Sequence, residues 1–185
     1  MPDIRESTVI KDVQIVHLKA FGDSRGRFME TFRKEWFPQR KWDNIQCNRS
    51  DSIGGVLRGL HYHFKQIDYW YVPQGHVRAG LFDMRPGSPT FGKSQVVNMG
   101  TDYQVGLYIP VGVAHGYYAV TDAMFTYVVD NYYDNTDEFG IRWDDPDANV
   151  NWGVTGEALT SGRDEANPFF ADVLPENLPK VWRPT

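Results

Sequence analysis

Apolar side chains recur at every second position in three short stretches of the chain. The alternation runs over 77–81, 105–109 and 125–129, where Val, Ala, Leu, Ile, Phe and Tyr occupy the odd-numbered positions. A period of two is the pattern of a half-buried β-strand, because successive side chains point to opposite faces of a sheet. The sequence therefore predicts β-strands in these three stretches.

Turn residues separate the predicted strands, with Gly and Pro clusters at 54–55, 86–89 and 110–112. Many short strands divided by such turns are typical of a β-sandwich or jelly roll. Helical periodicity is weak throughout. The stretch from Ala166 onward is rich in Pro and Asn, and we expect it to form short helical turns packed over one edge. The pattern predicts a single all-β domain over residues 1–185.

Composition and charge argue against some classes of binding partner. The chain is 41% hydrophobic and 23% charged, which is ordinary for a soluble globular protein. The formal charge of −5 argues against a nucleic-acid partner, whose binding surface is normally basic. A few arginines would still suffice to bind one diphosphate.

With no apolar stretch of the ~20 residues that a membrane span needs, and a polar N-terminus, we expect no membrane contact and a cytoplasmic enzyme. Cys47 is the only cysteine, which excludes a disulfide framework.

Four groups of segments carry the chemistry, and their order is informative. They are Phe21–Phe32; Gln46–Ser50 with Gly55–His63; Ser88–Gly92 with Pro110–Gly116; and Asn131–Tyr133 with Glu138–Ile141 and Leu159–Asp164. In this order they resemble the dTDP-4-dehydrorhamnose 3,5-epimerase family, from about Ile15 to about Pro168. The resemblance implies a cupin-type jelly roll (a double-stranded β-helix), a homodimer and no required metal cofactor. It also implies a nucleotide-sugar substrate, a 4-keto-6-deoxy sugar linked to dTDP.

The reaction of that family explains the residue types at three positions. A ketone at C4 acidifies the protons at C3 and C5, so epimerisation needs a base and an acid, each contributing roughly 10²–10⁴-fold. The resemblance assigns the base to His61 and the acid to Tyr127, whose normal pKa near 10 keeps it protonated. It assigns to Asp164 the orientation of His61, since a carboxylate on one ring nitrogen leaves the other free. As alternatives, His61 and Tyr127 would be core residues and Asp164 a turn cap.

The resemblance also implies eight residues that bind the substrate. Arginine suits a diphosphate because its planar guanidinium donates hydrogen bonds in pairs. Arginine or glutamate at such positions can equally be a solvated surface charge. The implied contacts are Arg25, Phe28 and Glu30 to the nucleotide and its base, Gln46, Asn48 and Arg58 to the sugar and diphosphate, and His115 and Glu138 elsewhere in the substrate site.

Two positions depart from the family pattern. The family usually has Gln two residues after the catalytic histidine, where this chain has His63, and Lys seven residues before Gly75, where this chain has Asp68. A cation beside the C4 oxygen would stabilise the enolate as negative charge develops. The negative charge of an aspartate would instead repel the enolate, so the site must stabilise the enolate in another way or lack the usual activity.

Three interpretations of these departures stay open. In the first, His63 and Asp68 form an ion pair and Lys65 supplies the missing positive charge to an epimerase. In the second, His61, His63, Asp68 and His115 bind a divalent metal, as in metal-dependent cupin isomerases and oxygenases, and the metal polarises a carbonyl oxygen. His61 could not then also be the base. In the third, the chain binds a sugar nucleotide without epimerising it.

Overall fold

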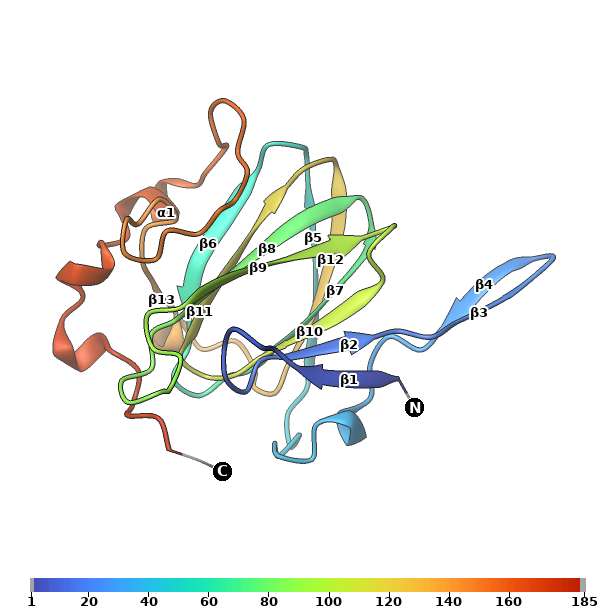
Figure 1. Cartoon of the computed structure of the whole chain (residues 1–185), viewed down its shortest axis with the longest axis horizontal. Coiled ribbons are helices and arrows are strands. Elements are labelled where there is room, and N and C mark those ends of the chain that lie inside the picture. The colour runs from blue at the N-terminus through green and yellow to red at the C-terminus, as the bar shows by residue number, and fades with distance from the viewer. Residues whose placement is uncertain (1, 184–185) are drawn as a thin grey trace.

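The computed structural model describes residues 2–183 and is built mainly of antiparallel strands in two facing sheets (Figure 1). The larger sheet has six strands in the order β1-β2-β10-β7-β12-β5. Their bounds are Asp3–Glu6 (β1), Gln14–His17 (β2), Val105–Ile109 (β10), Asp68–Gln74 (β7), Ala123–Val129 (β12) and Gln46–Ser52 (β5).

The smaller sheet has five strands in the order β13-β6-β11-β8-β9. Their bounds are Phe139–Gly140 (β13), Leu57–Tyr62 (β6), Val113–Ala119 (β11), His76–Asp83 (β8) and Ser94–Gly100 (β9). One apolar core joins the sheets, because its buried residues come from β7, β10 and β12 on one side and from β8, β9 and β11 on the other. The all-β, cupin-like jelly roll is confirmed.

The three alternating stretches form strands β8, β10 and β12. Val77, Ala79 and Leu81 are fully buried on β8, and Leu107 is fully buried on β10. Burying a side chain of the Val or Leu kind stabilises the fold by roughly 1.5–3 kcal/mol. The inward-facing half of each alternating pattern is therefore what holds the two sheets together.

A two-stranded hairpin projects from the body of the molecule (Figure 1). Strands β3 (Ala20–Asp23) and β4 (Gly26–Met29) pair only with each other among the described strands. Phe28 is 70% exposed and Phe21 is 56% exposed. A lone two-stranded hairpin is marginally stable in water, so this arm, residues 20–29, is a candidate for contact with another surface. The chain then returns to the body through the short helix η1 (Lys34–Trp36) and a cluster of Phe32, Trp36, Phe37, Trp42 and Tyr69.

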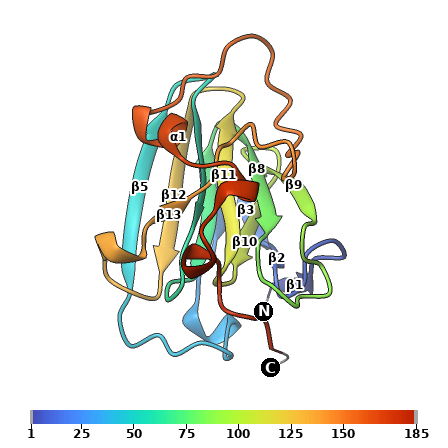
Figure 2. The same cartoon turned by 90° about the vertical axis from the view of Figure 1, so that its left-hand side faces the viewer.

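The C-terminal stretch lies at the opposite end from this arm and crosses one end of the sheets (Figures 1 and 2). It contains α1 (Gly162–Ala166), η3 (Phe170–Asp172) and η4 (Pro175–Asn177), while η2 (Asn135–Asp137) follows β12. The ring of Phe170 packs edge-on against Phe82 of β8, with 5.0 Å between centroids. The predicted short helical turns are therefore confirmed. The helices of residues 2–183 are all too short to span a bilayer.

Candidate functional site

A cavity of about 380 Å³ opens between the two sheets. Its walls come from β5, β7 and β12 of the larger sheet and from β6 and β11 of the smaller one. Strand periodicity explains its polar lining, because residues two apart on one strand share a face. Nine residues named from the sequence line it together: Gln46, Asn48, Arg58, His61, His63, Asp68, His115, Tyr127 and Glu138.

The proposed base and its orienting carboxylate form a hydrogen-bonded pair. His61 Nε2 lies 2.6 Å from Asp164 Oδ1, across 103 residues of sequence. Asp164 sits in the first turn of α1, where the Ser161 hydroxyl accepts from its backbone N–H, so Ser161 is the cap. The Asp164 carboxylate is thereby free to face His61, which leaves the other ring nitrogen, Nδ1, available for a proton.

Asp164 is ionised in this pair. Burial works to raise its pKa, but the hydrogen bond and charge of His61, together with the hydroxyl of Ser161, lower the pKa below its ordinary value. A buried carboxylate that is both charged and hydrogen-bonded stabilises the protonated form of its histidine partner. The pair is therefore arranged to accept a proton from a substrate in the cavity.

Tyr127 supplies a proton donor to the same cavity. It lies on β12, opposite Asn48 of β5 and Trp70 of β7. Burial raises the pKa of Tyr127, and the charges of Asp68 and Glu138 raise it further. Its hydroxyl is therefore protonated at neutral pH, as a general acid requires.

Two arginines face the cavity, and only Arg58 was foreseen. Arg58 donates from Nε to Ser52 Oγ at 3.3 Å, and no carboxylate of residues 2–183 pairs with it. Arg163 lines the cavity and pairs with Glu138 at 3.1 Å. The sequence signal for Arg163 was its place immediately before Asp164. Other lining residues missed from the sequence include Ser50, Gln66, Trp70, Tyr117, Phe125 and Tyr133.

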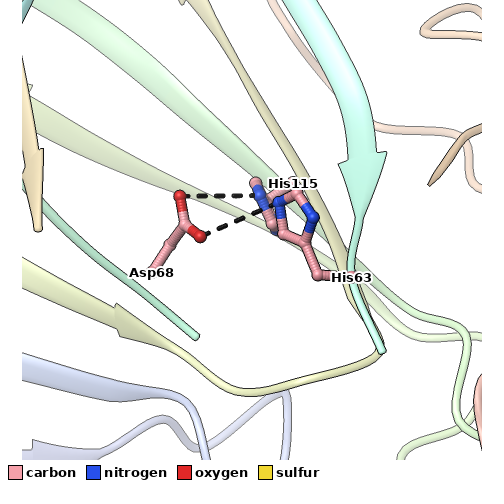
Figure 3. A group of neighbouring side chains, drawn as sticks. All are labelled: His63, Asp68 and His115. Atoms are coloured by element: carbon pink, nitrogen blue, oxygen red, sulfur yellow. Dashed lines mark ion pairs between the residues drawn. The ribbon is translucent and has the colours of Figure 1, made fainter. Parts of the chain in front are cut away.

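The two departures from the family pattern both face the cavity. His63, Asp68 and His115 are buried, with 5%, 4% and 5% of their surfaces exposed. Asp68 lies 3.8 Å from His63 Nε2 and 3.9 Å from His115 Nε2, and its carboxylate points at both rings (Figure 3). Burial lowers the pKa of His115 to about 4, so this imidazole is neutral at pH 7. Burial opposes ionisation of Asp68, but the histidines and hydrogen bonds from Trp70 and Gln66 lower its pKa overall.

Lys65 does not supply the missing positive charge. Its side chain is 58% exposed, and its ammonium lies 2.9 Å from Asp134 on the surface. Lys65 is also absent from the cavity lining. The expectation that this lysine replaces the family's cation was therefore wrong, because the turn after β6 carries it outward.

The expected nucleotide contacts lie outside the cavity of their own chain. Arg25, Phe28 and Glu30 belong to the projecting arm or follow it directly, and none lines the cavity. Arg25 pairs with Asp23 at 2.6 Å, and Glu30 pairs with Arg33. Within one chain the structure brings together the residues expected to contact the sugar and leaves these three apart.

Comparisons with known proteins show the family of the chain. The family model described as dTDP-4-dehydrorhamnose 3,5-epimerase matches residues 7–172. A dTDP-4-dehydrorhamnose 3,5-epimerase of Shigella flexneri is 40% identical over 172 residues, which cover 89% of this chain and 94% of that protein.

Two solved structures with 32% and 29% sequence identity to this chain have the same fold. The dTDP-6-deoxy-D-glucose-3,5-epimerase of Legionella pneumophila, in complex with dTDP-4-keto-L-rhamnose, superposes with a TM-score of 0.92 at 32% identity, covering 99% of this chain and all of that one. ChmJ, a 3′-monoepimerase of Streptomyces bikiniensis in complex with dTDP-quinovose, gives a TM-score of 0.88 at 29% identity, covering 96% and 93%.

Proposed function

Because this chain belongs to the dTDP-4-dehydrorhamnose 3,5-epimerase family, we propose that it inverts C3, C5 or both in a dTDP-linked 4-keto-6-deoxy sugar. One observation carries the proposal: the His61–Asp164 pair and Tyr127 face a single cavity from different sheets. A base and an acid on different walls can act on opposite faces of one sugar ring, which inversion requires.

The residues account for each proton in this reaction. His61 takes the proton from the carbon next to the C4 ketone, and the electron pair of the broken C–H bond forms the enolate. The hydroxyl of Tyr127 then returns a proton to the opposite face of that carbon, and the C4 carbonyl re-forms. Exchange with water restores the neutral imidazole and the phenol, so no cofactor is consumed.

Isotope exchange tests this function. In deuterated water, the protein is expected to introduce deuterium at C3, C5 or both of dTDP-4-keto-6-deoxyglucose, as followed by proton NMR and mass spectrometry. The pattern of labelling also reports whether one or both carbons react. If the sugar nucleotide binds by calorimetry but shows no exchange above the protein-free rate, the chain is a sugar-nucleotide-binding protein instead.

The position of the arm supports a homodimer in which the site is shared. Its exposed Phe28 and its Arg25 are suited to a nucleotide base and a diphosphate, yet they lie away from their own cavity. We place them in the cavity of a second copy of the chain. Isologous pairing of two copies would give each cavity one arm from the partner and cover the exposed aromatic surface.

Mixing two inactive variants tests the shared site. Arg25→Ala with Phe28→Ala removes the arm contacts, where one base–aromatic stack alone is worth about 1–3 kcal/mol. His61→Asn removes the base. Refolded mixtures of the two variants are expected to recover up to about a quarter of wild-type activity, because half of the dimers are mixed and each mixed dimer has one complete site. If the arm served its own chain, no mixed site would be complete and activity would not return.

A further inference from the structure

Three buried side chains, His63, Asp68 and His115, converge in the cavity. One potential metal-ligand atom of each residue lies within 4.8 Å of those of the other two. The nitrogen–oxygen distances of 3.8 and 3.9 Å are too long for hydrogen bonds, which usually span about 2.7–3.2 Å. These side chains therefore face one another across a buried space without bonding to each other.

 

The ring orientations follow from hydrogen bonds to the backbone. His63 Nδ1 lies 2.7 Å from the carbonyl oxygen of Asp137, and His115 Nδ1 lies 2.9 Å from that of Val113. A carbonyl oxygen only accepts, so each Nδ1 carries the hydrogen and donates it. Each Nε2 lone pair then faces the space beside Asp68 (Figure 3). Histidines that bind metals almost always donate their other N–H in this way.

The carboxylate is held just as firmly. Gln66 donates to Asp68 Oδ1 and Trp70 donates to Oδ2, both at 2.9 Å. Each oxygen keeps a second lone pair for another partner. Two imidazole nitrogens and a buried carboxylate, each oriented by other hydrogen bonds, therefore face one another across this space, an arrangement that a cation would complete.

From this geometry we propose that His63, Asp68 and His115 bind a divalent first-row transition-metal ion. Two imidazoles and one carboxylate are a ligand set for such ions, and three protein ligands leave positions open toward the cavity. Neighbouring ligands of such an ion stand about 3–3.4 Å apart, so the donors need to approach by less than about 2 Å. His61 does not belong to this group of donors, and its Nε2 faces Asp164 instead. The metal and the base therefore no longer compete for one residue.

The site also has a use in the proposed function, on which this step rests. His115 is the cross-strand partner of His61, so the ion would lie beside the base. An ion there would polarise the C4 oxygen and offset the charge of the enolate. It would take the electrostatic place of the lysine that Asp68 replaces.

Metal binding can be measured without any sugar nucleotide, so its result is separate from that of the isotope exchange. The intact protein is dialysed against a chelator and titrated with Co²⁺, whose visible absorption reports coordination, and with Zn²⁺ by calorimetry. We expect one ion per chain. Asp68→Asn and His63→Gln should each weaken binding by more than about 100-fold, since loss of an outer partner alone costs 10–100-fold.

A surface histidine provides the matched control. His76 lies outside the cavity and is paired with Asn98, so His76→Gln should bind the metal as the wild type does. Circular dichroism checks folding, and His63→Gln provides a second ligand variant if Asp68→Asn does not fold. Failure of the wild type to bind either ion stoichiometrically would overturn the proposal. Equal affinity in wild type and both folded ligand variants would overturn it too.

Discussion

Replacing His61 by asparagine is expected to reduce epimerisation by at least about 10³-fold, which equals roughly 4 kcal/mol of transition-state stabilisation. Asparagine is close in shape and can still hydrogen-bond to Asp164, which lies 2.6 Å from the native ring. It has no nitrogen that accepts a proton at neutral pH, so only the base is removed. The rate of deuterium incorporation into the sugar nucleotide measures the loss.

The same substitution at a distant histidine separates chemistry from stability. His76→Asn changes a half-buried side chain outside the cavity and should leave the rate unchanged. Circular dichroism and thermal unfolding of His61→Asn should resemble those of the wild type, since the His61 side chain is 25% exposed. Activity of His61→Asn within tenfold of wild type would exclude His61 as the base.

Strand periodicity predicted the core because burial itself imposes the pattern. The alternating stretches of β8, β10 and β12 each place one face against the opposite sheet, so their apolar residues are visible in the sequence. Strand β5 (Gln46–Ser52) carries no such signal. It lies at the edge of its sheet, and its inward residues Gln46 and Asn48 face the polar cavity rather than the core.

Site residues could be predicted from the sequence where a family motif identifies them. They could not be predicted where only the fold determines which side chains lie next to each other. His61 and Asp164 are 103 positions apart, and family resemblance rather than spacing paired them. Lys65 shows the limit of sequence proximity: it is two residues from His63, but its side chain reaches Asp134 on the surface. The projecting arm shows another limit, because the hydrophobic pattern of the sequence does not tell which surface an exposed hairpin contacts.

Restoring the family's residues at both departures, His63→Gln with Asp68→Lys, is expected to make epimerisation independent of metal. The change removes two of the three proposed ligands and places an ammonium group where the carboxylate now stands. A fixed cation near a developing oxyanion is worth about 10²–10³-fold in rate, because charge interactions are strong in a cavity that excludes water. The wild type should therefore lose about 10²-fold or more of its rate in chelator, and the double variant should lose none.

Comparing the four rates, wild type and double variant with and without chelator, separates the electrostatic role of the metal from a structural one. If the ion only held the cavity together, the double variant would be as inactive as the chelated wild type, since its lysine cannot bridge His115 to a second ligand. If Asp68 and His63 formed a simple ion pair, chelator would not affect the wild type, while the new lysine would still raise the rate. Only a cation acting on the enolate oxygen predicts both a chelator-sensitive wild type and a chelator-resistant double variant. In that case the negative charge on the sugar needs a positive charge beside it, and either a metal ion or a lysine ammonium group can supply that charge.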